Sequence, residues 1–424
     1  MEPTERSNIS RCVAGEGLFG LGMGLVAAMT ALPLLLENLG AGKIVLGLAF
    51  SICTAGWMMG QPVGLMLFGR KRRSKRFLVP WAFCCSVPTY AGMALAVLLL
   101  GVSAPGACAA VILLLLAVRF GGGGAVVPLW QDWQAMMFRR KVRGRAVGMI
   151  AGGSAFGVTV AALAAGAVRR TIGFPNSYAL LFAGSALFCA AGLGFYAAVR
   201  EPEVVRQAVP TLRVRDLFGR FARSFGEPNF RNYLIGRALL TLGAGGAAFY
   251  AVHFKSPDGG GLAESTVIAV GMFLTLPQAI ASPILGRIGD RRGHKSGVLL
   301  GAVAQLGSIA VAFLGRGLGA CILAFGLMGV AWASAWVSHS NMLFETCPHD
   351  SRAAHITLSN VFLGPFVLLV PLATGWMMAN WTGVRAGLGV TLVPTVVGIL
   401  YLLVVVKEPR TLEMEAAARA REAA

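Results

Sequence analysis

The sequence predicts an all-α polytopic membrane protein with twelve transmembrane helices in two six-helix, pseudo-symmetric halves. The 424 residues are 56% hydrophobic and 13% charged, and a soluble protein carries about twice that charged fraction. The apolar residues form runs long enough to cross a bilayer, which takes about 20 residues. An apolar segment with glycine and proline, followed by a dense basic turn, occurs twice, at residues 61–76 and 282–295. Two similar membrane halves are typical of secondary transporters.

The apolar runs are expected to be helices, because backbone polar groups in lipid must find their hydrogen bonds within the segment. They do not show the period-two alternation that a membrane β-barrel requires. Twelve spans are expected near residues 12–36, 44–68, 77–101, 106–130, 145–168, 177–199, 232–254, 264–286, 297–315, 317–342, 353–379 and 384–406.

The longest polar interval lies between the sixth and seventh spans. We therefore divide the chain into an N-terminal six-helix half at 1–199, a cytoplasmic linker at 200–231, a C-terminal six-helix half at 232–406 and a cytoplasmic tail at 407–424.

The basic residues predict the orientation of the spans. Of the 37 Lys and Arg residues, 29 fall in segments that share one side of the membrane with the N-terminus, and six fall in turns on the other side. Cytoplasmic loops carry the excess of Lys and Arg, so both termini are expected in the cytoplasm. The Ala-, Gly- and Arg-rich composition favours a bacterial inner membrane. We expect a multi-pass monomer whose main partner is the lipid bilayer.

Composition argues against several other classes of protein. A net charge of +19 suggests a nucleic-acid partner, but the basic residues sit in short turns where membrane topology explains them. Most of the eight cysteines lie in apolar runs and act as small hydrophobic residues, so neither a metal site nor a disulfide framework is predicted. The sequence has no phosphate-binding Gly-Lys-Ser/Thr loop and no nucleophile triad. We expect no cofactor and no enzymatic activity.

The second basic turn has a specific pattern. It runs Gly286-Arg-Ile-Gly-Asp290-Arg291-Arg292-Gly293-His-Lys295, which is a Gly, then Asp-Arg-x-Gly, then a basic residue. With a six-and-six division of spans over residues 12–406, it resembles the signature turn of the major facilitator superfamily. The resemblance implies that family's fold, with spans 1, 4, 7 and 10 around a central cavity and transport by alternating access. The first copy departs from the pattern, since Gly69 occupies the aspartate position.

Five residues are candidates for gating: Gly286, Asp290, Arg291, Gly293 and Arg143. Asp290 sits where a helix ends, and its carboxylate can accept from backbone amides at a neighbouring helix N-terminus or pair with a basic residue. Such a contact exists only when the inner ends of the two halves are closed together. Arg143 begins Arg143-Gly-Arg-Ala-Val-Gly148, which resembles the family's loop between the fourth and fifth spans. The alternative is that these residues only fix topology.

Two arginines fall within spans. A charge at mid-membrane costs about 2.5 kcal/mol or more, so Arg119 must face protein or water and have a partner. Arg119, Gly122 and Gly123 also resemble the family's fourth-span motif. Arg237 lies one to two turns into the seventh span, where its side chain can extend towards the inner face. Each arginine either binds substrate or serves as a structural tie.

Five further residues are candidates for substrate binding or coupling. Glu16 and Asp132 can act as protonatable coupling groups or arginine partners, since a carboxylate beside a cation has a tunable pKa, or they can simply be solvated. Gln61, Gln278 and Asn360 are uncharged polar groups in or near spans, and each needs a hydrogen-bond partner there. They line the cavity or tie helices together.

The sequence therefore favours a secondary transporter that moves a small solute, driven by protons or by the solute's own gradient. Two arginines without a mid-span carboxylate suggest that the solute is anionic. A non-transporting membrane assembly factor on the same fold is the alternative, and a membrane enzyme acting on lipid is a third class. The enzyme reading needs a His or acidic cluster at one membrane face, which the sequence does not show.

Overall fold

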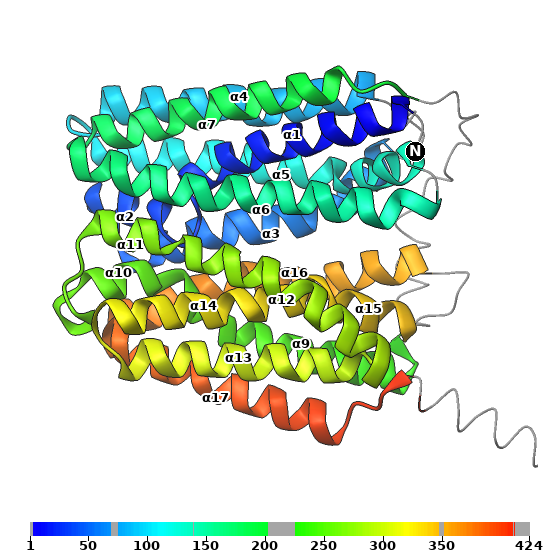
Figure 1. Cartoon of the computed structure of the whole chain (residues 1–424). Helices are drawn as coiled ribbons and strands as arrows, with labels where there is room; N and C mark the ends of the chain where they lie inside the picture. The colour runs from blue at the N-terminus through cyan, green and yellow to red at the C-terminus, as the bar shows by residue number, and fades with distance from the viewer. Residues whose placement is uncertain are drawn as a thin grey trace, which may run out of the picture.

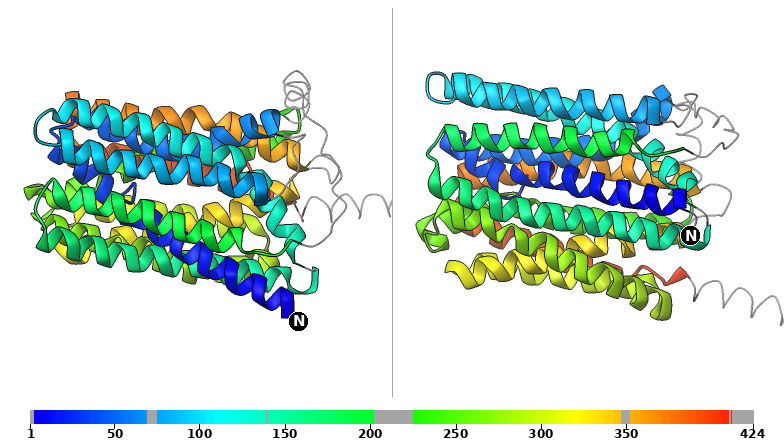
Figure 2. Two further views of the ribbon diagram at one scale, coloured as in Figure 1. Left: turned by 90° about the horizontal axis from the view of Figure 1, so that it is seen from above. Right: turned by 45° about the horizontal axis from the view of Figure 1, so that its top comes forward.

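The computed structural model describes residues 3–68, 75–138, 140–201, 225–346, 352–409 and 411, and within these ranges all regular secondary structure is helical. The expected linker therefore lies mostly outside the described residues, as does most of the tail. Figure 1 shows the long helices side by side along one common direction, with α1–α7 in its upper part and α9–α17 in its lower part. The other views show the same alignment (Figure 2). The N-terminus lies at the end of the bundle where α17 also finishes.

The helices of the first half have these bounds: α1 Pro3–Leu25, α2 Ala31–Asn38, α3 Lys43–Phe68, α4 Lys75–Leu100, α5 Pro105–Met137, α6 Arg140–Thr171 and α7 Asn176–Ala197. The second half holds α9 Pro228–Ala244, η1 Gly245–Phe249, α10 Tyr250–Lys255, η2 Pro257–Gly259, α11 Glu264–Val270, α12 Met272–Arg292, α13 His294–Leu314, α14 Gly317–Trp336, α15 Ser338–Glu345, α16 Arg352–Met377, η4 Met378–Thr382 and α17 Gly383–Val404.

The twelve-helix prediction agrees with these elements. Ten helical stretches in the described part of the chain are long and apolar enough to cross a membrane. One of them, Ser359–Val404, contains both α17 and most of α16, and α1 with α2 makes a further crossing. Large apolar side chains such as Leu114, Leu187 and Val393 are more than 60% exposed near the middle of their helices. Lipid would cover such side chains.

Four expected spans are not continuous helices, which corrects the sequence analysis. The first breaks between α1 and α2, where Pro33 occupies the first turn of α2 and its ring prevents α1 from running on. The seventh passes through the 3₁₀ segment η1, which begins with Gly245 and Gly246, residues of low helix propensity. The eighth breaks between α11 and α12 at Gly271, and the tenth between α14 and α15 at Val337.

Close helix packing positions the two halves. A Cβ at Gly157 of α6 would lie 2.0 Å from the Gly17 carbonyl oxygen of α1, so only glycine permits this contact within the first half. A Cβ at Gly47 of α3 would lie 2.3 Å from the Pro371 carbonyl oxygen of α16, which belongs to the second half. Small residues allow helices to approach closely in lipid, where dispersion rather than water exclusion drives association. The α3–α16 pair and the α6–α11–α12 group join the halves.

Candidate functional site

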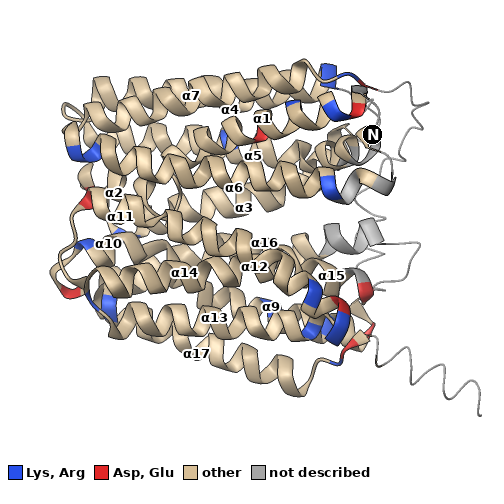
Figure 3. Ribbon diagram, in the orientation of Figure 1, with Lys and Arg blue, Asp and Glu red and all other residues tan. Residues whose placement is uncertain are grey.

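Charged residues gather at the two ends of the helix bundle and are sparse between them in the described part of the chain (Figure 3). We call the end that holds the N-terminus the inner end, following the orientation predicted from the basic residues, and the opposite end the outer end. The candidate site has three parts: an outer charge network, a middle region with two arginines, and an inner region around the signature turn.

The outer charge network consists of Glu37, Asn38, Arg169, Tyr178, Lys255 and Glu264 and joins the two halves. Glu264 of α11 pairs with Arg169 of α6, with Nη2 to Oε2 at 3.0 Å and Nε to Oε1 at 3.0 Å. Asn38 Nδ2 donates to Glu264 Oε1 at 3.0 Å, and the Tyr178 hydroxyl donates to the same oxygen. Arg169 and Glu264 side chains are only 11% and 12% exposed.

A second cation completes this network. Lys255 of α10 lies 2.8 Å from Glu37 Oε2 of α2 and 3.8 Å from Glu264 Oε2. Every charge in the network thus has an opposite charge across the boundary between the halves. The network forms only while the outer ends of the halves are in contact.

Sequence reasoning did not identify this network. Neither Glu37 nor Arg169 was among the candidate residues, yet both bind the other half. Two features of the sequence would have indicated it. Arg169 and Lys255 are among the few basic residues on the outer side, and Glu264 begins an apolar segment. Isolated opposite charges at the same predicted depth are candidates for pairing.

Arg119 of α5 is enclosed within the first half. It is 1% exposed, and its guanidinium carbon lies 5.4 Å from the Phe19 ring centre and 5.5 Å from those of Tyr90 and Phe120. Its Nε and Nη2 have no hydrogen-bond partner in the described part of the chain. Aromatic faces stabilise a cation, but they leave these donors unsatisfied. These neighbours all belong to the first half, so a ligand would have to enter between its helices.

Arg237 of α9 is partly exposed. Thr241 and Ala244 follow at i+4 and i+7, which places all three on one face of α9, and both are also partly exposed. His339 of α15 lies near the Arg237 guanidinium and is held through its ring by the Tyr233 hydroxyl at 2.9 Å. Among the described residues, none forms an ion pair or a hydrogen bond with the Arg237 guanidinium, although the Thr241 hydroxyl donates to the Arg237 backbone carbonyl at 2.9 Å. This side chain is therefore a cation open to a ligand.

Two of the expected polar residues meet across the boundary between the halves. Asn360 Nδ2 of α16 donates to Gln61 Oε1 of α3 at 3.1 Å. Gln278 lies one helical turn from Thr275 of α12, whose hydroxyl is 3.0 Å from that of Thr159 of α6. Gln278 is partly exposed on this face. The structure thus brings Gln61 and Asn360 together and does not bring either arginine into contact with them.

The two candidate carboxylates differ in what the structure describes. Glu16 Oε2 of α1 accepts a hydrogen bond from the Tyr196 hydroxyl of α7 at 2.5 Å, and Ser154 of α6 is a second partner. Glu16 is thus tied within the first half, three positions from Phe19, which contacts Arg119. Asp132 lies in α5, but its side chain is outside the described part of the structure, as is that of Arg143 in α6.

The signature turn lies at the inner end. Asp290 and Arg291 are exposed at the end of α12, Gly286 lies one turn earlier, and Gly293 has φ +86°. A Cβ at Gly293 would lie 2.3 Å from the Glu408 carboxyl carbon. Glu408 also accepts from the Lys295 backbone N–H at 2.9 Å, at the start of α13. Glycine is required here both by its φ and by this carboxylate.

The first half repeats this contact. Glu201 accepts from the Lys75 backbone N–H at 2.8 Å, at the start of α4, and from Trp133 Nε1 at 2.8 Å. Glu201 and Glu408 occur in Arg-Glu-Pro and Lys-Glu-Pro sequences that end the sixth and twelfth spans. A carboxylate at a helix N-terminus satisfies free N–H groups and the helix dipole. Residues 69–74 of the first basic turn, including Gly69, lie outside the described residues.

Comparison with known proteins gives one family match and a set of structures with the same fold. Residues 256–423 match the family model described as Major Facilitator Superfamily. This match covers most of the second half of the chain, and the first half is compared through its fold alone. Solved structures of transporters align over 95% or more of the length of this chain, so the whole chain has a transporter fold. A search against curated protein sequences finds no match.

Three of these structures show how far the likeness extends. A mutant form of the nucleoside transporter NupG aligns with a TM-score of 0.75 at 13% identity, over 95% of this chain and all of that one. A bacterial homologue of the human lysosomal transporter Spinster, inward-facing and unoccupied, gives 0.70 at 16% identity, over 97% and 98%. The xylose transporter XylE from E. coli, partially occluded and inward open, gives 0.68 at 14% identity, over 96% and 99%. Identities this low establish the fold of this chain, not its solute.

Proposed function

We propose that this protein is a secondary transporter that moves a small anionic solute across a bacterial inner membrane by alternating access. The observation that carries the proposal is the uneven contact between the halves. At the outer end they are joined by the buried Arg169–Glu264 pair, and further along α6 by the Thr159–Thr275 contact. Inward of that contact, Val147 of α6 and Ile280 and Ile284 of α12 are all more than 40% exposed. The halves therefore separate towards the inner end on the α6–α12 side, while Gln61 and Asn360 still join them on the α3–α16 side. A state closed outside and partly open inside would have this arrangement.

The charge of the solute is inferred from Arg237. A cation inside a membrane protein is costly without a partner, and this one has none among the described residues. Its planar fork suits a carboxylate or phosphate. Thr241, Gln278 and the Gln61–Asn360 pair would supply neutral hydrogen-bonding groups. The similar structures carry a nucleoside and xylose in their names, so the fold alone does not determine charge.

Arg119 has a different place in the proposal. Because its neighbours all lie in the first half, it would respond to the state of Glu16 and Phe19 on α1 rather than contact the solute in this conformation. Glu16 would carry the coupled proton. It is hydrogen-bonded to Tyr196 of α7, has Ser154 of α6 as a second partner, and lies one helical turn from Phe19, which contacts Arg119.

The test uses purified protein in proteoliposomes. Candidate carboxylates, phosphates, neutral sugars and cations are first screened by the shift they produce in melting temperature, and those that bind are tested for counterflow. Anionic solutes should bind, and Arg237→Gln should lose binding while Arg287→Gln, an exposed arginine on α12, should keep it. A cation or neutral solute whose binding survives Arg237→Gln would overturn the assignment. No flux of any binding solute, with a protein partner that co-purifies, would favour an assembly factor on the same fold.

A further inference from the structure

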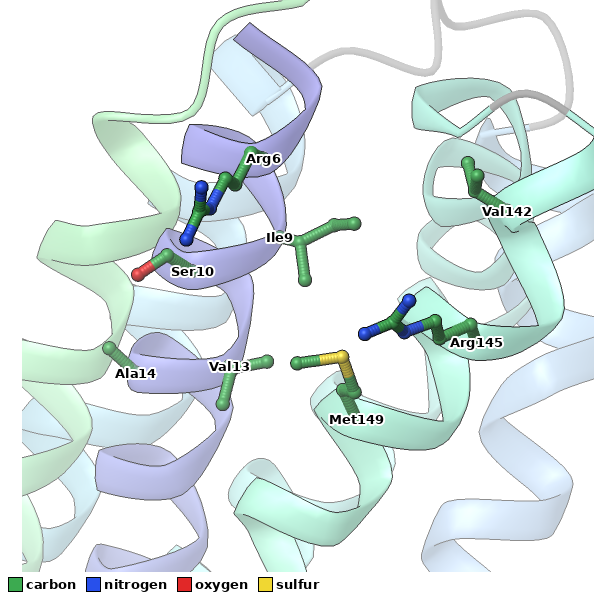
Figure 4. Close-up of a pocket in the computed structure, with 8 residues that line it drawn as sticks. All are labelled: Arg6, Ile9, Ser10, Val13, Ala14, Val142, Arg145 and Met149. Atoms are coloured by element: carbon green, nitrogen blue, oxygen red, sulfur yellow. The ribbon is translucent and has the colours of Figure 1, made fainter. Parts of the chain in front are cut away.

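A cavity of about 680 Å³ lies between the inner ends of α1 and α6 (Figure 4). Its walls are mostly apolar, and each wall carries one arginine. Arg6 lies over Ser10 on the α1 side, and Arg145 extends from α6 towards α1, as does Met149. The residues that line it are Arg6, Ile9, Ser10, Val13, Ala14, Val142, Arg145 and Met149.

The helix packing explains why the cavity opens at this depth. Further out, α1 and α6 touch through glycine, as at Gly17 and Gly157. The last such contact before the cavity is at Gly153, where a Cβ would lie 2.9 Å from the Val13 carbonyl oxygen. Inward of it, both helices carry side chains larger than glycine on the facing surfaces, and the helices no longer touch along their backbones.

Neither arginine of the cavity is paired within the part of the chain that the structure describes. Among the described residues, none forms a salt bridge or hydrogen bond with the Arg6 or Arg145 guanidinium. Both side chains are exposed. Two unpaired cations on opposite walls of an apolar-walled cavity favour an anionic group attached to an apolar body.

The face of α6 that carries Arg145 indicates where that apolar body lies. Met149, Phe156 and Leu163 follow at i+4, i+11 and i+18 from Arg145, which places them within about 40° of one another on the helix. They are 46%, 72% and 48% exposed. At the depth of Leu163 the flanks of α6 are covered by α1 and α11, through Ala161 and Gly166. The exposed stripe therefore faces lipid, and from Met149 to Leu163 it extends about 21 Å.

We propose that this cavity binds an acidic phospholipid of the inner leaflet. The phosphate group would lie between Arg6 and Arg145, and one acyl chain would follow the stripe formed by Met149, Phe156 and Leu163. Basic pockets between transmembrane helices on the cytoplasmic side bind acidic headgroups. The stripe is longer than half of a hydrocarbon core about 30 Å thick, so it can accommodate a chain of one leaflet. This site is independent of the transport proposal.

The experiment measures lipid bound to the purified protein by native mass spectrometry. Phosphatidylglycerol and phosphatidylcholine with identical chains are compared on the wild type, on Arg6→Gln/Arg145→Gln, and on the control Arg287→Gln/Arg292→Gln. The control removes the same charge from exposed positions on α12. We expect the wild type and the control to bind phosphatidylglycerol more tightly than phosphatidylcholine. The affinity of the cavity variant for phosphatidylglycerol should be about 30-fold lower than that of the wild type. Equal loss on both variants would show a general charge effect and overturn the site.

Two further arms separate the lipid from a soluble anion. Glycerol phosphate at millimolar concentration should not displace bound phosphatidylglycerol, because it lacks the chain. Met149→Gln, which keeps all charges, should lower phosphatidylglycerol affinity several-fold. Full displacement by glycerol phosphate, with no effect of Met149→Gln, would assign the cavity to a soluble anion and refute the lipid proposal.

Discussion

Glu264→Gln tests the outer charge network, because the Glu264 carboxylate is its central acceptor. Asn38, Arg169 and Tyr178 bind this carboxylate directly, and Lys255 lies 3.8 Å from it. At an effective dielectric constant of about 20, two unit charges 3.0 Å apart, the Arg169–Glu264 separation, attract by about 5 kcal/mol. Desolvation of two largely buried groups cancels part of this attraction, and a glutamine still accepts from Asn38 or Tyr178. We therefore expect the outward-closed state to lose about 2–3 kcal/mol, which shifts the population about 30- to 150-fold.

The measurement is the distance between spin labels at Ala41 and Ala263, in a background from which the native cysteines have been replaced. Ala263 is exposed and Ala41 partly so, at the outer end of opposite halves. Glu264→Gln should broaden and lengthen the distance distribution. Asp258→Asn removes an exposed outer carboxylate that forms no salt bridge among the described residues, and it should leave the distribution unchanged. An unchanged distribution in folded Glu264→Gln protein would show that the network does not hold the halves together.

Three other predictions concern the inner end and the topology. Asp290→Asn should weaken the outward-open state by about 1–3 kcal/mol, seen as greater labelling of inner-face cysteines at unchanged expression; equal labelling would leave Asp290 with a role in topology alone. Glu408→Gln should lower the free energy of unfolding by about 1–2 kcal/mol, because the Lys295 N–H loses a charged acceptor, and a thermal melt against the exposed-site variant Glu227→Gln checks it. Externally added thiol reagents should reach cysteines placed at 256–263 and miss those at 70–76; the reverse pattern would invert the orientation.

The sequence was sufficient to predict the fold because hydrophobic run length and basic turns are local properties. Twelve spans, the resemblance to the superfamily and the signature turn around Gly293 needed no knowledge of contacts. The helix breaks were missed because hydropathy does not distinguish α-helix from 3₁₀ or from a short non-helical joint. Pro33 and the Gly245-Gly246 pair were the available signals.

The site was less predictable than the fold, because it depends on pairs brought together from distant parts of the chain. Gln61 and Asn360 were both expected to need partners, but nothing in the sequence indicated that they partner each other across 299 positions. Arg119 was expected at mid-span, and it is there, but only the structure shows that aromatic rings of the first half enclose it. The outer network was missed for the same reason, since Arg169 and Glu264 are separated by 95 positions.

The helix breaks and the outer network occur together, and this suggests how the outer end opens. Glu37 and Asn38 lie on α2, Lys255 on α10 and Glu264 on α11, which have 8, 6 and 7 residues. Each short helix is separated from its long neighbour by a break, and Thr30 in the first break packs against Gly271 in another. Hinges are a few residues at element ends that absorb changes in φ and ψ. Loss of the network would therefore let the short helices tilt first.

Two further label pairs distinguish this local opening from rigid rocking of the halves. Thr171 and Leu318 report on the outer ends of the long helices α6 and α14. Val147 and Ile284 report on the inner parts of α6 and α12. All four residues are helical and exposed. Under local opening, Glu264→Gln lengthens the Ala41–Ala263 distance while both other distances stay constant. Under rigid rocking, the Thr171–Leu318 distance lengthens and the Val147–Ile284 distance shortens together, because the halves turn about the contacts between them. The breaks in α1–α2, α9–α10 and α11–α12 predict the first result, and coupled changes in all three distances would refute it.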